Sequence, residues 1–168
     1  INNQEVSNRK EVIVHKGLFY IGLAPRRYVG EAGKEQIVDV KVVDIQRAPV
    51  ANQDVQAILM LRNWYSVQKE GPDGRWYWDW EVEETPVQTV TVKTDAKGEA
   101  EARMTPKEGG SYKVRATATD SRGNKIRSAT YLWVSSGEWI SWRQDNNDRI
   151  ELIADKKEYK VGETAEIL

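Results

Sequence analysis

Five stretches of this sequence alternate between apolar and polar residues, and this alternation constrains the fold more than any other feature. Successive side chains of a β-strand point to opposite faces, so a period of two produces one buried face and one solvated face. Antiparallel sandwiches have this pattern, whereas amphipathic helices repeat every three or four residues. We expect the apolar members to form the interior, among them Val38, Val40, Leu59, Leu61, Val114 and Ala116.

Turn residues divide the chain into about eight strand-like runs, and no window has the spacing and caps of a helix. Residues 95–98 end in glycine and predict a hairpin between two runs. Pro86 separates two others, which we interpret as one kinked strand because proline lacks a backbone donor. The pattern predicts an all-β, immunoglobulin- or fibronectin-III-like antiparallel β-sandwich. The runs lie near 18–24, 36–46, 55–65, 75–84, 87–94, 99–105, 111–120 and 125–134.

Composition excludes several classes of function. The formal net charge is -1, which gives no electrostatic basis for binding nucleic acid or anionic membranes. The sequence has no cysteine, which excludes disulfides, thiolate nucleophiles and zinc–thiolate sites. No apolar run approaches the roughly 18 residues of a transmembrane helix. The first residue is not Met and we find no signal peptide, so we expect a fragment of a longer protein.

The two ends of the chain contain related sequences, which predicts a tandem array of domains. Residues 124–134 resemble residues 4–14, and residues 158–163 resemble residues 27–34. Both offsets correspond to about one domain length. We therefore expect three parts. Residues 1–15 are the closing strand of a preceding domain, 16–141 form a complete sandwich, and 148–168 are the opening strands of a truncated following domain.

Several sequence blocks, in this order, resemble bacterial alpha-macroglobulins, a family of alpha-2-macroglobulin-like protease inhibitors. The resemblance covers nearly the whole chain and implies a fragment that spans one macroglobulin domain. The last block is similar to the start of the next domain in that family. The blocks are VIVHKGLFYIGL (12–23), NWYSVQKE (63–70), WDWEVEETPV (78–87), GGSYKVRATATDSRGN (109–124), TYLWVSSGE (130–138) and RIELIADKKEYKVGETAEIL (149–168).

The resemblance implies a structural role in a broad-spectrum protease trap. In that family a protease cuts a bait segment, and the shell of macroglobulin domains rearranges and cages it. The partners implied are neighbouring macroglobulin domains of the same parent chain, and target proteases through the parent. The implied location is extracytoplasmic, in the periplasm or cell envelope, with a membrane-anchored or secreted parent. Many members carry a cysteine-based thioester, which this cysteine-free chain cannot contain.

Alternating tryptophans on one predicted strand form the main candidate interaction surface. Trp76, Trp78 and Trp80 share one face of the strand, and Trp64 is expected across from them. Such a row could stack on sugar rings, or it could be a packing ridge, because aromatic cross-strand pairs stabilise sheets. We favour packing, either against the same sandwich or against a neighbouring domain.

The opposite face of that strand is acidic. One interpretation is a calcium site or a patch for a basic partner, because hard cations prefer several oxygen ligands. The interpretation that we favour is a solvated strand face, since the spacing matches no known calcium loop. The residues concerned are Tyr77, Asp79 and Glu81, followed by Glu83 and Glu84.

Nothing in the sequence predicts catalysis. His15 is the only histidine, and no serine or acid forms a recognisable motif with it, so we expect a hydrogen-bonding or hinge role. We predict no catalytic residue, no cofactor or metal site, and no nucleic-acid or small-molecule substrate. Two alternatives stay open: a surface adhesin or carbohydrate-binding sandwich that uses the tryptophan-rich strand, and an accessory β domain of an enzyme.

Overall fold

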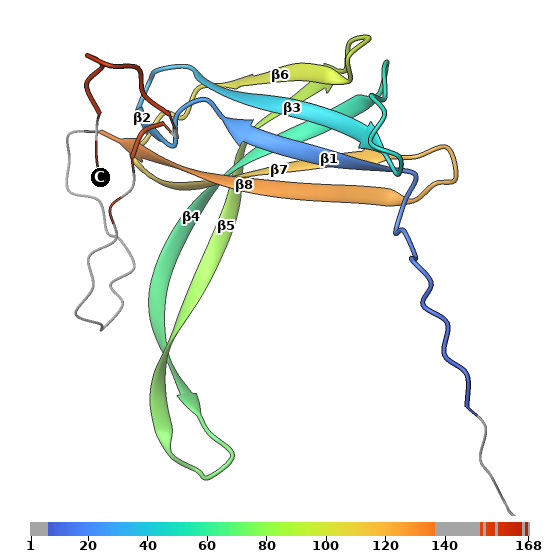
Figure 1. Ribbon diagram of the computed structural model, residues 1–168. Helices are drawn as coiled ribbons and strands as arrows, with labels where there is room; N and C mark the ends of the chain where they lie inside the picture. The colour runs from blue at the N-terminus through green and yellow to red at the C-terminus, as the bar shows by residue number, and fades with distance from the viewer. Residues whose placement is uncertain (1–6, 137–151, 153, 157, 166, 168) are drawn as a thin grey trace, which may run out of the picture.

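The protein folds as an all-β domain, as the alternation predicts (Figure 1). The computed structural model describes residues 7–136, 152, 154–156, 158–165 and 167. Among these residues there are eight strands and no helix. The strands are β1 (Phe19–Pro25), β2 (Val29–Glu31), β3 (Gln36–Asp44), β4 (Asp54–Glu70), β5 (Trp76–Lys93), β6 (Glu99–Met104), β7 (Gly110–Thr119) and β8 (Lys125–Ser135).

The strands form two sheets that pack face to face. One sheet has three strands in the order β1-β3-β6, and the other has five in the order β2-β8-β7-β4-β5. The long pairs are antiparallel, as expected, but the three-residue strand β2 pairs with β8 in parallel. Figure 1 shows β1 and β8 running in the same direction in the two layers. The next strand, β2, joins the other layer without reversing this direction, so it pairs with β8 in parallel.

The predicted interior forms the core between the sheets. Val38, Val40, Leu59 and Val114 are at most 1% exposed. Burial of each such side chain stabilises the fold by about 1.5–3 kcal/mol. Leu61 is only partly buried but packs against the same cluster. The other core residues, including the predicted Ala116, are Phe19, Ile21, Val42, Val55, Ala57, Ala102, Met104, Tyr112, Ala116, Ala118, Ile126, Leu132 and Val134.

The turn at residues 95–98 forms, but it does not make the predicted hairpin. It connects β5 of the large sheet with β6 of the small sheet, so the flanking strands are not paired with each other. Gly98 has φ 72°, which favours glycine. A β-carbon at this position would lie 2.4 Å from the carbonyl oxygen of Val42, so the crossing also requires close backbone approach. Alternation predicts strands, but not which sheet each strand joins.

The two runs around Pro86 form one continuous strand, β5, as predicted. Leu59 pairs with Gln88 and Met60 pairs with Pro86, so Val87 has no partner of its own on β4 and forms a β-bulge. A bulge bends a strand and increases its twist. Proline is tolerated there because β5 is an edge strand of the sheet.

Beyond this bulge, β4 and β5 leave the sandwich as a two-stranded arm (Figure 1). β7 pairs with β4 only from Gln56 to Arg62, whereas β5 pairs with β4 as far as Glu70. We call residues 63–83 the arm. The predicted run 55–65 ends near its base, so the sequence indicated less than the full length of β4.

The described parts of the chain ends lie outside the two sheets. Residues 7–18 form no strand, and Val12, Ile13 and Val14 are more than two-thirds exposed. Near the other end, Ala154 forms an isolated antiparallel bridge with Ile167. The division into 1–15, 16–141 and 148–168 stays a prediction, and residues 1–6 and 137–151 lie outside the described residues.

Candidate interaction surface

The base of the arm is held by one arginine between two aromatic rings. The guanidinium carbon of Arg62 lies 4.8 Å from the ring centroid of Trp64 and 4.8 Å from that of Tyr131 on β8. Its Nε lies 3.2 Å from Oε1 of Glu84, an ion pair without hydrogen-bond alignment. Lys113 Nζ donates to both oxygens of Glu84, at 3.0 and 2.9 Å. These contacts connect β4, β5, β7 and β8 at the point where the arm begins.

The charge of Glu84 belongs to this arrangement. Burial alone would raise the pKa of the Glu84 carboxyl, but Lys113 and then Arg62 favour the carboxylate and hold the pKa below its ordinary value. The side chain of Glu84 is therefore an anion at neutral pH. It neutralises two cations beneath the aromatic rings.

The tryptophans of the arm lie on one face and are open to solvent. Glu70 pairs with Trp76, Gln68 with Trp78, Ser66 with Trp80 and Trp64 with Val82, so all four tryptophans share the same face. Trp76, Trp78 and Trp80 are 64%, 67% and 42% exposed, while Trp64 is half-buried on Arg62. Packing of the three exposed rings against their own sandwich, one of the two arrangements we expected, is therefore wrong. They continue the face of β4 that carries Arg62, which is the outer face of the five-stranded sheet, so the three-stranded sheet does not cover them.

The opposite face of the arm is polar and paired within itself. Lys69 Nζ lies 2.6 Å from Oδ2 of Asp79 and 3.2 Å from Oε1 of Glu81. The hydrogen bond to Asp79 and then that to Glu81 raise the pKa of the Lys69 ammonium. Tyr65 donates its hydroxyl to Glu81 at 3.4 Å. Within the described part of the chain, no group of three or more acidic, histidine or cysteine side chains could hold a metal ion.

His15 forms a hydrogen bond, the role expected of it. Its Nδ1 lies 2.6 Å from the hydroxyl of Tyr20 on β1, and the two rings meet edge to face with centroids 5.9 Å apart. Both side chains are exposed. This contact joins the segment before the sandwich to its first strand.

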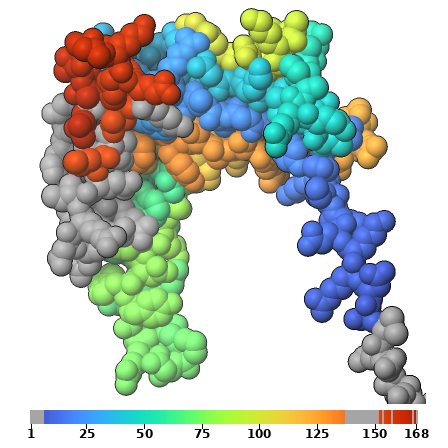
Figure 2. Space-filling view, in the orientation of Figure 1, coloured from blue at the N-terminus to red at the C-terminus, as the bar shows by residue number. Residues whose placement is uncertain are grey.

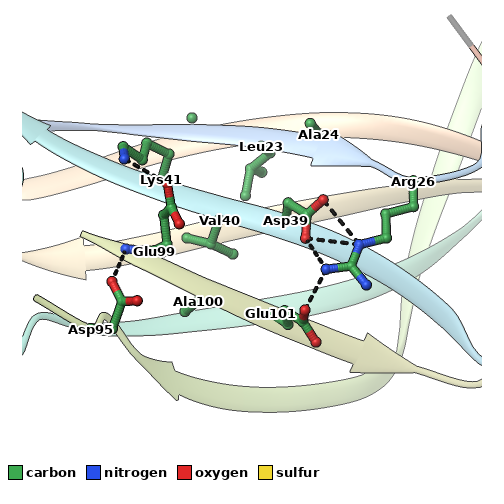
Figure 3. Close-up of a pocket in the computed structure, with 11 residues that line it drawn as sticks. Leu23, Ala24, Arg26, Asp39, Val40, Lys41, Asp95, Glu99, Ala100 and Glu101 are labelled. Carbon is green, nitrogen blue, oxygen red and sulfur yellow. Dashed lines mark hydrogen bonds and ion pairs between the residues drawn. The ribbon is translucent and has the colours of Figure 1, made fainter. Parts of the chain in front are cut away.

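An open depression on the outer face of the three-stranded sheet is occupied by ion pairs (Figure 3). Arg26 lies between two carboxylates, 2.8 Å from Asp39 and in contact with Glu101, and Figure 3 shows the three side chains pointing toward one another. Lys41 Nζ lies 2.8 Å from Glu99. The hydrogen bonds that the Arg26 guanidinium donates to Asp39 and then to Glu101 raise its pKa further. These opposite charges form ion pairs across neighbouring strands, which is typical of a solvated sheet face.

Asp155 connects the C-terminal segment to the sandwich, and sequence reasoning missed it. The residue is 1% exposed, and its backbone carbonyl accepts a hydrogen bond from Tyr28 N at 2.8 Å. Its carboxylate accepts from the Tyr159 hydroxyl and lies 3.4 Å from Arg27 Nη2. The carbonyl of Tyr28 in turn accepts from Trp133 N. A short irregular segment has no periodicity, so no pattern in the sequence indicated this contact.

The described surface combines a tryptophan face, an internally paired polar face and paired charges on the small sheet. In the same described residues no helix has the length and apolar character needed to cross a membrane. Exposed aromatic rings on a projecting element are typical of an interaction surface.

The sequence of the chain matches a protein family and a curated relative. The family is described as bacterial macroglobulin domain 6, and the match covers residues 22–137. An alpha-2-macroglobulin homolog of Nostoc sp. is 28% identical over 177 residues, which cover 100% of this chain and 9% of that protein.

Two solved structures share the fold at low sequence identity. The native conformation of Escherichia coli alpha-2-macroglobulin aligns with a TM-score of 0.59 and 19% identity, over 96% of this chain and 11% of that one. Salmonella alpha-2-macroglobulin reacted with methylamine aligns with a TM-score of 0.53 and 16% identity, over 90% and 10%. The chain thus spans about a tenth of the length of these proteins. Since the family match covers most of the sequence and the fold agrees, the chain belongs to the bacterial macroglobulin domain 6 family.

Proposed function

We propose that this domain is a non-catalytic part of the shell of a protease-trapping bacterial alpha-macroglobulin that works outside the cytoplasm, in the periplasm or cell envelope. The observation that carries the proposal is the family match over residues 22–137, in a chain that covers 9% of its curated relative. A domain of this kind positions its neighbours in the parent chain. Target proteases meet the parent as a whole.

The geometry of the domain supports a mechanical role. The sandwich has a continuous core, and both of its flanking segments are attached to it by hydrogen bonds. His15 bonds to Tyr20 on one side, and Asp155 bonds to Tyr28 on the other. Such contacts set the direction in which the chain enters and leaves the domain.

Protease assays on the purified parent protein test the proposal. A caged protease retains activity toward small peptides and loses it toward large proteins. We expect this difference for the parent, and its loss when Val114→Asp places a charge in the core of this domain. The isolated 168-residue chain should inhibit neither reaction. A parent that leaves cleavage of large substrates unchanged would contradict the proposal.

The exposed tryptophans favour one second candidate, a carbohydrate-binding sandwich. Trp76 and Trp78 are each about two-thirds exposed, as rings that stack on sugars must be. Titration of the chain with oligosaccharides would then produce a saturable change in tryptophan fluorescence. An unchanged spectrum over the millimolar range would remove this candidate.

A further inference from the structure

The tryptophan face of the arm lacks a covering layer among the described residues. This even-numbered face carries the four tryptophans together with Ser66, Gln68 and Glu70, and the odd-numbered face carries the ion-paired Lys69, Asp79 and Glu81. In a sandwich the apolar face is covered by a second sheet, and the polar face is solvated. The three-stranded sheet covers the opposite face of β4, where Leu59 and Leu61 point inward, and Figure 2 shows the arm projecting from the sandwich body away from that sheet.

A two-stranded arm is poorly stable without further packing. An isolated hairpin is at best marginally stable in water, and more strands or a packing partner are needed to order it. Among the strands that the structure describes, β5 alone pairs with β4 from Asn63 to Glu70. The cation–π contacts of Arg62 stabilise the base, while the tip at residues 71–75 lies far from them (Figure 1).

The exposed aromatic area is large enough for a protein interface. A tryptophan buries about 150–250 Å² when it is covered. At the observed exposures, Trp76, Trp78 and Trp80 together present roughly 260–430 Å², about a third to a half of the ~800 Å² that each partner contributes to a standard interface. Tryptophan, tyrosine and arginine are also the residues that carry most binding energy at protein interfaces.

The shape of the arm fits a protein better than a sugar chain. Two-stranded ribbons twist more strongly than wide sheets, and the bulge at Val87 adds twist at the base. Figure 1 shows β4 and β5 crossing along the arm. Rings two residues apart are therefore rotated relative to each other and do not form one flat stacking platform. A twisted apolar face can be covered by a second twisted sheet, as in any sandwich.

We propose that the tryptophan face of the arm docks on another domain of the same parent chain, which supplies the missing layer. This inference rests on the proposed function only in that the domain lies within a longer macroglobulin. The relatives are about ten times longer than this chain, so a parent of similar length offers many further domains. Tethering in one polypeptide gives an effective concentration in the millimolar range, which favours an internal partner over a second copy or a separate protein.

Photo-crosslinking in the full-length parent tests the docking. A photoreactive phenylalanine analogue replaces Trp78, and in a matched control it replaces Tyr77 on the opposite face, which is 50% exposed. We expect position 78 to crosslink to peptides of the same polypeptide outside these 168 residues, and position 77 to give at least tenfold less product. Crosslinks to saccharide, to another protein or to a second copy would overturn the inference, as would equal yields at both positions.

Hydrogen exchange provides a second readout that needs no substitution. Amides of residues 63–83 should exchange at least tenfold more slowly in the parent than in the isolated chain, while amides of β7 change little. Equal exchange in both proteins would also overturn the inference. The protease assay is independent of these measurements. If trapping occurs without crosslinks, only the docking fails, and if crosslinks form without trapping, only the proposed function fails.

Discussion

The guanidinium of Arg62 stacks on the ring of Trp64, 4.8 Å from its centroid, at the last position where β4 still pairs with β7. The two residues lie on the same face of the strand, one inside the five-stranded sheet and the other in the arm. A cation–π contact is worth about 0.5–1 kcal/mol at an exposed site and about 2 kcal/mol when it is shielded from solvent. The contact therefore couples the position of the arm to the packing of the sandwich.

Replacing Arg62 should loosen this base. Arg62→Ala removes both aromatic contacts and one of the two cations beside Glu84. We expect the free energy of unfolding to fall by about 1–3 kcal/mol in urea titrations, with faster amide exchange in the arm. The control is Arg75→Ala at the arm tip, where the side chain is 89% exposed and a change within about 0.5 kcal/mol is expected. Equal losses in the two variants would contradict this account of the base.

Gly98 should tolerate no side chain, for two separable reasons. Its φ is 72°, and a β-carbon would lie 2.4 Å from Val42 O and 3.0 Å from Val50 N. Gly123 has a similar φ of 82° with nothing near its β-carbon position. Gly123→Ala therefore measures the backbone strain alone, about 1–2 kcal/mol. We expect Gly98→Ala to cost at least about 2 kcal/mol more by thermal or urea unfolding. Equal costs would show that the chain moves away from Val42 freely.

Asp120 should make stability depend on pH in the acidic range. Burial would raise the pKa of its carboxyl, but hydrogen bonds from Asn124, Leu18 and Arg122 outweigh burial and hold the pKa below the ordinary 3.8. A carboxyl with a lowered folded-state pKa contributes stability that is complete above its unfolded pKa and is lost as pH falls through the folded value. Asp120→Asn removes this contribution and cannot accept all of these bonds.

The measurement is the melting temperature from pH 7 down to pH 2. Asp120→Asn should melt below the unmodified protein at pH 7, and the difference should shrink as pH falls below about 3.8. Asp54→Asn serves as the control because that carboxylate is 66% exposed and lies 3.6 Å from Lys93. A difference that stays constant down to pH 2 would mean that the ionised form of Asp120 contributes nothing.

The alternation in the sequence was sufficient for the core because it is a property of each strand alone. Val38, Leu59 and Val114 could be assigned to the interior without any knowledge of their neighbours. Strand β2 was not predicted, because its three residues are too few to show a period. The turn at Gly98 was found, but its connection between sheets depends on long-range packing.

The candidate surface was also predicted in part, because the alternation within a single strand shows which side chains share a face. Period two placed Trp76, Trp78 and Trp80 on one face, and their pairing with β4 confirms it. Alternation predicts which face of a strand is apolar, but it does not predict whether another layer covers that face. The exposure of the rings could therefore not be foreseen. The contact of Arg62 with Tyr131 joins strands far apart in the sequence, and no local pattern indicates it.

The direction of the arm should depend on Val87, the residue without a partner at the bulge. Deleting Val87 allows β5 to pair with β4 without interruption, so the alternation of faces on both sides is kept while the bend and extra twist are lost. The sandwich should therefore still fold, and the arm should leave it at a different angle. Because the chain has no cysteine, spin labels can be attached at chosen sites only.

Pulsed electron paramagnetic resonance between Asp73→Cys at the arm tip and Thr119→Cys at the end of β7 measures this angle as a distance. The mean distance should shift on deletion of Val87. A second pair, Lys34→Cys with Thr119→Cys, lies outside the arm and should keep its distance. An unchanged distance to the arm tip would show that the bulge does not direct the arm. A shift in both pairs would show that the deletion alters the sandwich itself, and the bulge would then be part of the core architecture.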